Sequence, residues 1–134
     1  MELTGGCQCG AVRYRLNGEP FYTALCHCGD CRKSAGAPVV HWTAFPAAAF
    51  ELTQGELKDY RSSELGTRSF CPTCGTGIKY VNEANLPGLV DIQGGTLDDP
   101  DALPPQINVQ AAERLAFLAT ANELPSFDRY PVAP

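Results

Sequence analysis

Seven cysteines are the residues of this chain best suited to chemistry, and they are concentrated in three short clusters. The clusters are Cys7 with Cys9, Cys26 with Cys28 and Cys31, and Cys71 with Cys74. An odd number of thiols cannot pair completely in disulfides, whereas metal coordination leaves no remainder. Close spacing is also how a chain delivers several ligands to one ion. The pattern therefore predicts metal binding.

Two of the clusters together predict a closed zinc site. Cys71-Pro72-Thr73-Cys74-Gly75 has the spacing of a zinc knuckle, in which two intervening residues let both sulfurs turn toward one ion. Cys7-Gln8-Cys9-Gly10 is a tighter pair with the same trailing glycine. Two pairs make a four-thiolate site that joins distant parts of a short chain and adds folding energy. The alternatives are a disulfide or a redox-active CxxC, but thioredoxin-like motifs need a βαβ context that this sequence does not indicate.

The third cluster, Cys26-His27-Cys28-Gly29-Asp30-Cys31, predicts an open zinc site. Three thiolates leave one coordination position free, which is the catalytic pattern, and their softness favours an external thiol as the fourth ligand. Such a site would lower the pKa of the thiol and present it to an electrophile. His27 competes for the fourth position, but between two ligands it more naturally supports the site or contacts substrate. The alternatives are a second structural zinc or three reduced cysteines that bind metal weakly.

The segments between the cysteines predict a mainly β fold of short antiparallel strands clasped by metal, with little helix. Glycine and proline break the chain often, and one domain is expected over residues 1–134. In the first expected strand Val12 and Tyr14 share one face and Arg13 the other. A short helix is expected over 29–34 and further helical turns over 113–121. The expected strands cover residues 11–16, 21–25, 39–45, 57–61, 68–70, 78–81, 89–93 and 107–109.

Composition narrows the partners and the location. The net charge of −5 argues against nucleic acid as a general partner. No apolar stretch is long enough to cross a bilayer, and the first residues do not have the pattern of a signal peptide. Reduced thiols then indicate the cytoplasm.

Several motifs in this order resemble the glutathione-dependent formaldehyde-activating enzymes, the GFA or CENP-V domain family. The resemblance covers nearly the whole chain. The motifs are Gly6-Cys7-Gln8-Cys9-Gly10, Cys26-His27-Cys28-Gly29-Asp30-Cys31-Arg32-Lys33-Ser34-Ala35-Gly36, Tyr60-Arg61-Ser62-Ser63, Phe70-Cys71-Pro72-Thr73-Cys74-Gly75-Thr76, Gly95-Thr96-Leu97-Asp98-Asp99-Pro100 and Leu124-Pro125-Ser126-Phe127.

The resemblance implies a β-tent fold with two zinc ions per chain. It assigns Cys7, Cys9, Cys71 and Cys74 to the structural zinc and Cys26, Cys28 and Cys31 to the catalytic zinc. The implied activity is that of a carbon–sulfur lyase, in which glutathione adds to formaldehyde to give S-hydroxymethylglutathione. A non-catalytic, zinc-stabilised binding module of the same fold is the second hypothesis. The chain departs from the family near Gln106 and Phe117, where other members tend to carry His and Trp.

Cations and aromatic residues near the clusters are further candidates for substrate contact. Glutathione is anionic, and Arg32 and Lys33 directly follow the open cluster, while Arg68 and Lys79 are expected to flank the closed one. Trp42 is expected in the core or at an interface, on the face opposite His41. Asp98-Asp99-Pro100 is expected to form a turn, not an acid–base pair.

Overall fold

The computed structural model describes residues 1–131 and contains ten strands in two sheets within that range. The mainly β prediction is confirmed. The single domain predicted over 1–134 includes residues 132–134, which lie outside the described part. Among the described residues, no helix combines the length and apolar character needed to span a bilayer.

The smaller sheet has the order β1-β2-β5, from strands Glu2–Gly6, Arg13–Asn17 and Phe50–Gln54. Both pairings are antiparallel. The predicted alternation in the first expected strand is confirmed, because Val12, Tyr14 and Leu16 are at most 1% exposed while Arg13 and Arg15 are half-buried. The sequence did not predict β1 or β5. β1 ends in two glycines and β5 is largely exposed, so neither shows a strong strand pattern, and both form by pairing with β2.

The larger sheet has seven strands in the order β10-β3-β4-β9-β8-β7-β6. The eight strands predicted from sequence correspond to these seven and to β2. The bounds are β3 Tyr22–Cys26, β4 Val40–Pro46, β6 Lys58–Arg61, β7 Gly66–Phe70, β8 Gly77–Asn82, β9 Leu89–Gln93 and β10 Ile107–Val109. One pairing differs from the antiparallel prediction, since β10 lies parallel to β3. The long connection from β9 brings the chain back to that edge in the same direction as β3, and a parallel pair needs such a crossover.

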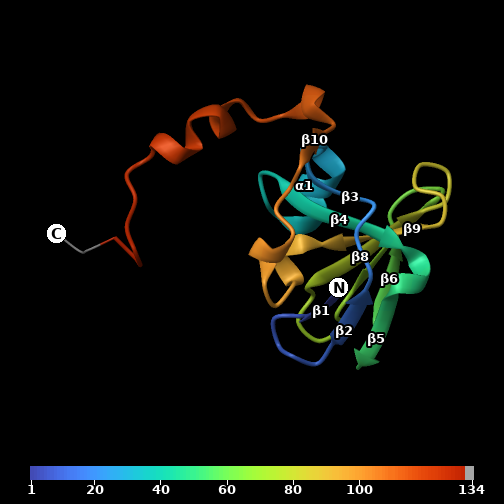
Figure 1. The fold of residues 1–134 in the computed structure, drawn as a ribbon. Coiled ribbons are helices and arrows are strands. Elements are labelled where there is room, and N and C mark those ends of the chain that lie inside the picture. Colours follow the sequence, from blue (N-terminus) through green and yellow to red (C-terminus); the bar gives the residue numbers. More distant parts are fainter. Residues whose placement is uncertain (132–134) are drawn as a thin grey trace.

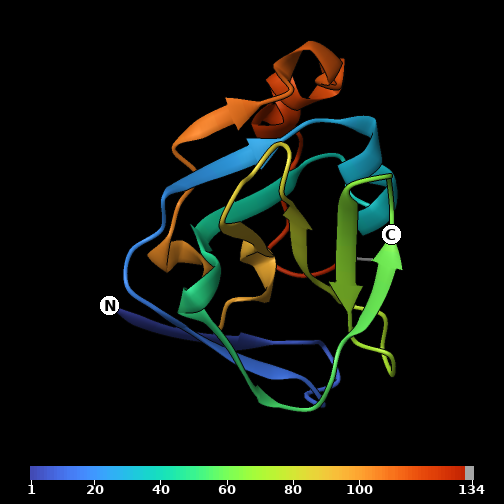
Figure 2. The same ribbon diagram turned by 90° about the vertical axis from the view of Figure 1, so that its right-hand side faces the viewer.

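The core lies between the two sheets, which Figure 2 shows as separate layers with β1 and β2 (dark blue) along the lower side of the view. Tyr14 and Leu16 of β2 meet Phe45, Ile78 and Ile92 of the larger sheet there. This core uses one face of the larger sheet. The other face carries Trp42, Tyr80 and the open cysteine cluster.

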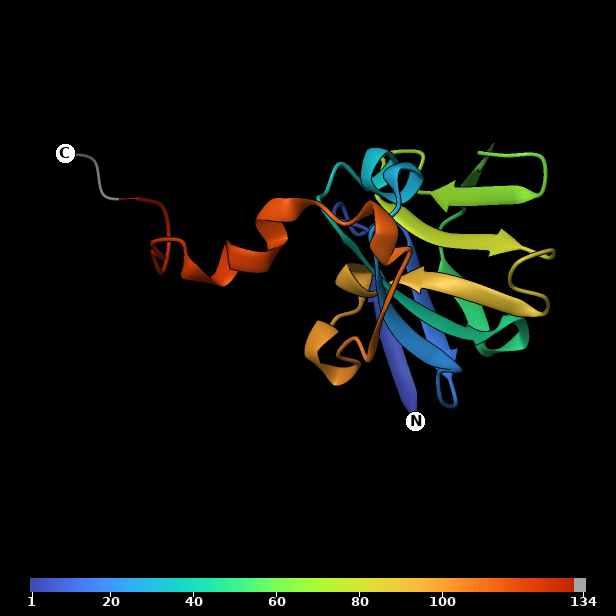
Figure 3. The ribbon, with the colours of Figure 1, turned by 90° about the horizontal axis from the view of Figure 1, so that it is seen from above.

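Helical structure is sparse, as predicted. The one α-helix of the described chain, α1, spans Gly29–Ala35, which confirms the predicted helix and places Cys31 in its first turn. Short 3-10 helices follow at Ala47–Ala49, Gly94–Thr96, Pro100–Ala102 and Ala111–Glu113. A longer one, Ala116–Glu123, matches the helical turns predicted near residues 113–121. It belongs to a segment that leads away from the body of the protein toward the C-terminus (Figures 1 and 3).

Candidate functional site

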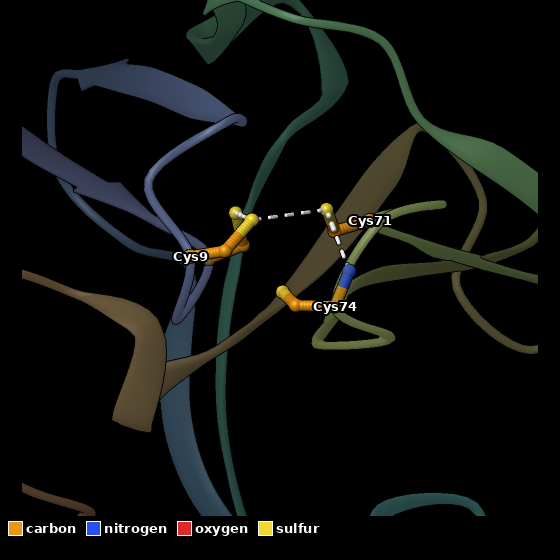
Figure 4. A group of neighbouring side chains, drawn as sticks. Cys9, Cys71 and Cys74 are labelled. Carbon is orange, nitrogen blue, oxygen red and sulfur yellow. Dashed lines mark hydrogen bonds between the residues drawn. The ribbon is translucent and has the colours of Figure 1, made fainter.

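The four cysteines of the predicted closed site come together from two distant segments. The loop between β1 and β2 supplies Cys7 and Cys9, and the turn between β7 and β8 supplies Cys71 and Cys74. All four sulfurs lie within 4.8 Å of one another. Figure 4 shows the sulfurs of Cys9, Cys71 and Cys74 directed toward a common centre.

The geometry of this cluster fits a tetrahedral zinc ion. Tetrahedral Zn–S bonds of about 2.3 Å require sulfurs about 3.8 Å apart. The Sγ atom of Cys9 lies 3.6 Å from Sγ of Cys7 and 3.9 Å from Sγ of Cys71. Backbone N–H groups donate to these sulfurs: Val12 to Cys7 at 3.2 Å, and Cys74 to Cys71 at 3.4 Å. Such donors favour the thiolate form that a metal needs. The cluster could therefore hold a metal ion with all four positions filled by protein.

A threonine ties the two halves of the closed cluster together. The hydroxyl of Thr76 lies 3.2 Å from Cys74 Sγ and accepts a hydrogen bond from the backbone N–H of Gln8 at 3.1 Å. Its hydrogen bonds lower the pKa of the Cys74 thiol to about 5. The residue after the knuckle thus contacts both the Cys7–Cys9 loop and the Cys71–Cys74 turn.

The open cluster forms where β3 ends and α1 begins. Cys26 is the last residue of β3. Cys28 is the N-cap of α1, and its Sγ accepts a hydrogen bond from the backbone N–H of Cys31 at 3.3 Å. The three sulfurs lie within 4.8 Å of one another, and those of Cys26 and Cys28 are 3.5 Å apart. These spacings also fit one zinc ion. Because only three protein ligands converge among the described residues, a fourth position would remain for another ligand.

Hydrogen bonding within and beside the open cluster favours a thiolate at Cys31. Hydrogen bonds with Cys26, then with Cys28 and Arg68, lower the pKa of the Cys31 thiol to about 5. The Nη2 atom of Arg68 lies 3.8 Å from Cys31 Sγ. Arg68 flanks the closed cluster in the sequence, but its side chain contacts the open one. Although Arg68 is only three positions before Cys71, its side chain projects from the sheet face that carries the open cluster.

The other residues proposed from sequence as substrate contacts have distinct environments. His27 is only 3% exposed, and its Nε2 lies 2.8 Å from Oδ1 of Asn108 in β10. Arg32 donates from Nε to the carbonyl of His27 at 3.2 Å, so its side chain is turned toward the loop. Lys33 is exposed and lines a hollow of about 420 Å³ together with Arg68. Substrate contact by His27, Arg32 and Lys33 stays a prediction.

The open cluster faces a cavity of about 340 Å³ on the outer face of the larger sheet. Residues of six strands line it, namely β3, β4, β7, β8, β9 and β10, together with Cys28, Asp30 and Cys31 at the start of α1. The lining includes Cys26, Cys28, Cys31, Trp42, Tyr80 and Asp91. Trp42 is 4% exposed, as expected of a core residue, yet it borders this cavity.

A second hollow of about 410 Å³ continues from the first and shares Trp42 and Arg68 with it. It extends over β6, β7 and β8 toward Gly75 in the turn that carries the closed cluster. Lys58 and Lys79 line it, with Nζ of Lys79 5.1 Å from the centre of the Phe50 ring. The two hollows form one groove that begins at the open cluster. Its lining has three cations, which are all in the second hollow, and four carboxylates, of which only Asp59 is in the second hollow and Asp30, Asp91 and Glu113 are in the first.

Sequence reasoning missed Asp91 and Tyr80, which border the cavity. Tyr80 lies under the Arg68 guanidinium, 4.8 Å from its central carbon to the ring centre. A signal for Asp91 was present in the sequence, because it is a charged residue in the middle of the buried strand Leu89–Gln93. Carboxylates are rarely buried without a purpose or a partner.

Comparisons with known proteins agree with this geometry. Residues 2–113 match the family model described as glutathione-dependent formaldehyde-activating enzyme. A Halomonas elongata protein named a putative glutathione-dependent formaldehyde-activating enzyme is 31% identical over 120 residues, covering 79% of this chain and 72% of its own. The fold resembles the crystal structure of a Rhodobacter sphaeroides protein with a TM-score of 0.63 and 20% identity, over 80% of this chain and all of that one.

Proposed function

Because the chain belongs to the glutathione-dependent formaldehyde-activating enzyme family, we propose that it is a carbon–sulfur lyase that adds a small thiol to an aldehyde at the open cluster. The thiol is glutathione and the aldehyde formaldehyde in this proposal, and the product is the S-hydroxymethyl thiol. One observation carries the proposal: three sulfurs converge at the wall of a cavity of about 340 Å³. Among the described residues no fourth protein ligand joins them.

In this proposal Cys26, Cys28 and Cys31 hold the catalytic zinc, and Cys7, Cys9, Cys71 and Cys74 hold the structural zinc. When bound at the open cluster, zinc supplies a coordination position at which an external thiol can be held in its deprotonated form. The protein ligands are fixed before substrate arrives, because Cys28 caps α1 and Cys26 belongs to the sheet. A ligand set held by regular elements keeps its geometry while the fourth position exchanges.

The groove beside the cluster supports an anionic thiol as substrate. The protein as a whole is acidic, with a net charge of −5, yet the outer hollow of the groove is lined by Arg68, Lys58 and Lys79 and by one carboxylate, Asp59. Two carboxylates and one amine give glutathione a net negative charge at neutral pH, and cations in a groove raise the local concentration of such a ligand. Arg68 is placed between the sulfur cluster and the outer hollow, where it can pair with a carboxylate of the bound thiol.

The protein would act where thiols stay reduced, and we propose the cytoplasm. Disulfide formation between cysteines of the open cluster would remove the metal ligands.

Two measurements test the proposed function. Metal analysis of the purified protein should give two zinc ions per chain, one of them removed readily by a chelator and protected by added glutathione. NMR exchange spectroscopy of glutathione with formaldehyde should then show faster interconversion when the zinc-loaded protein is present. A single, tightly held ion with no acceleration would favour the zinc-stabilised binding module instead.

A further inference from the structure

Asp91 occupies the middle of a row of side chains that crosses the outer face of the larger sheet. In β9 it pairs with Tyr80 of β8 on one side and with Ala44 of β4 on the other. The row continues to Arg68 of β7 beyond Tyr80, and to Tyr22 of β3 beyond Ala44. Alternate residues of a strand share a face, so Cys26, four residues after Tyr22 in β3, lies on the same face as Tyr22. The register therefore aims Asp91 into the cavity that the open cluster borders.

The carboxyl group of Asp91 is buried without a hydrogen-bonding partner at Oδ1. The residue is 6% exposed, and within residues 1–131 this oxygen has no hydrogen bond. Buried carboxylates are normally paired, because an unpaired buried charge is costly. Asp91 does not belong to the group of sulfurs that could hold a metal ion. The Asp91 side chain lines the cavity, and a carboxyl group there that lacks a protein partner is suited to meet a ligand.

The neighbours of Asp91 leave its charge uncompensated. The Arg68 guanidinium is directed to the Tyr80 ring and to Cys31 Sγ, and the Tyr80 hydroxyl accepts a hydrogen bond from Asn82. The charged forms of Tyr22 and of the Cys31 thiol both oppose ionisation of the carboxyl. The other titratable groups that line the cavity, Cys26, Cys28, Asp30 and Glu113, are neutral or negative and offer Asp91 no cation. Burial, with the charge of Cys31, raises the pKa of Asp91 to about 7. At neutral pH the group can therefore both accept and donate a proton.

We propose that Asp91 is a catalytic residue that accepts the proton of the incoming thiol and returns it to the aldehyde oxygen. This inference rests on the proposed function. The thiol S–H bond breaks and the proton passes to the carboxylate of Asp91; the sulfur electron pair then forms the C–S bond as the C=O π bond opens. The oxygen takes the proton back from Asp91, so the product hydroxyl holds the hydrogen that the thiol brought. No oxidant or further reactant is needed.

Proton counting on thiol binding tests this role independently of turnover. Zinc-loaded protein is titrated with glutathione at pH 7 by calorimetry in buffers of different ionisation enthalpy, which gives the number of protons released per thiol bound. The negative charge of the bound thiolate raises the pKa of Asp91 further, so the carboxyl retains part of the thiol proton and the wild type should release only about half a proton, whereas Asp91→Asn should release about one. Asp30→Asn, which removes an exposed carboxylate from the same cavity, serves as the control and should match the wild type.

The wild type also provides a test that does not depend on a variant folding. Below pH 6 Asp91 is already protonated and cannot accept the thiol proton, so release by the wild type should rise toward one proton per thiol. In exchange spectroscopy Asp91→Asn should slow the glutathione–formaldehyde reaction by about 100-fold or more, with zinc content and circular dichroism unchanged.

The outcomes separate this inference from the proposed function. Equal proton release by wild type and Asp91→Asn, or release by the wild type that does not change with pH, overturns the role of Asp91 even if the protein is an active enzyme. A proton difference without any acceleration of the reaction upholds transfer to Asp91 and refutes the proposed function. Failure of the wild type to bind glutathione and 2-mercaptoethanol refutes both.

Discussion

The guanidinium of Arg68 contacts the sulfur of Cys31, with 3.8 Å between Nη2 and Sγ, although 37 residues separate them in the chain. The same guanidinium lies over the Tyr80 ring, which holds it in place from below. A three-thiolate zinc site has a net negative charge, and a cation beside one of its sulfurs offsets part of that charge. Arg68 therefore links the metal ligands to the groove in which an anionic thiol would bind.

Replacing Arg68 should weaken metal binding at the open cluster. Arg68→Ala removes the positive charge near Cys31 and is expected to lower the zinc affinity of the open site about tenfold, because groups that support metal ligands contribute on that scale. Competition with a chromophoric chelator would measure this change. Lys58→Ala, an exposed cation of the same groove, is the matched control and should leave the affinity within twofold of the wild type. Equal losses in both variants would show a general charge effect instead.

The two cysteine clusters should respond differently to loss of a ligand. Cys74→Ser is expected to prevent folding, because a structural zinc contributes about 10–16 kcal/mol and a domain of this size is stable by only about 5–15 kcal/mol. Cys28→Ser should abolish the thiol–aldehyde reaction while the domain still folds. Circular dichroism with thermal melting measures folding, and exchange spectroscopy measures the reaction. Unfolding of Cys28→Ser to the same extent would contradict this division of roles.

A glycine next to β9 should tolerate no side chain. A Cβ atom at Gly94 would overlap the imidazole ring of His41, which is held in the neighbouring strand β4. Gly94→Ala is therefore expected to destabilise the fold by about 1–3 kcal/mol, the usual range for overpacking. Denaturant unfolding of the zinc-loaded protein would measure it.

The adjacent Gly95 offers a close control for that substitution. A Cβ there meets no atom within 4 Å, and the backbone does not have a positive φ. Gly95→Ala should be neutral or slightly stabilising, by up to about 1 kcal/mol, since alanine restricts the unfolded chain more than glycine does. Similar losses in both variants would rule out the steric explanation.

An ion pair in the loop after β9 should make part of the stability depend on pH. Asp98 receives hydrogen bonds from Arg13 of β2, at 3.0 Å from Nη1 to Oδ1, and from the hydroxyl of Thr4 of β1 at 2.6 Å. These bonds lower the pKa of Asp98. A lowered pKa in the folded state gives stability that is present above the unfolded pKa of about 4 and is lost as pH falls through the folded value.

Asp98→Asn is accordingly expected to cost about 0.2–1 kcal/mol at pH 7, the range for an exposed pair, and progressively less below pH 4. Urea unfolding at pH 7, 5, 4 and 3 would give the difference between variant and wild type at each pH. Asp99→Asn, which leaves the pair with Arg13 intact, should not show the same trend. A difference for Asp98→Asn that stayed constant from pH 7 to pH 3 would contradict an ionic origin.

Strand prediction succeeded where a segment had its own pattern and failed where pairing supplied the stability. Leu89–Gln93 and Ile107–Val109 were predicted with the observed bounds, because each is a short apolar segment between breakers. Glu2–Gly6 and Phe50–Gln54 were missed. The first ends in two glycines and the second is largely exposed, and both are fixed by their hydrogen bonds to β2. A partner strand distant in sequence cannot be inferred from local composition.

Cysteine type and spacing were enough to predict both clusters and the helix that begins at the open one, because metal ligands and a helix cap are set by residues a few positions apart. The tertiary structure alone decided what surrounds the open cluster. In the folded chain Arg68 contacts the open cluster, although in the sequence it is near the closed one. His27 contacts Asn108, and Asp91 lines the cavity. The physical reason is strand register: the face on which a side chain projects, and the side chains beside it, depend on which strands pair and in what alignment.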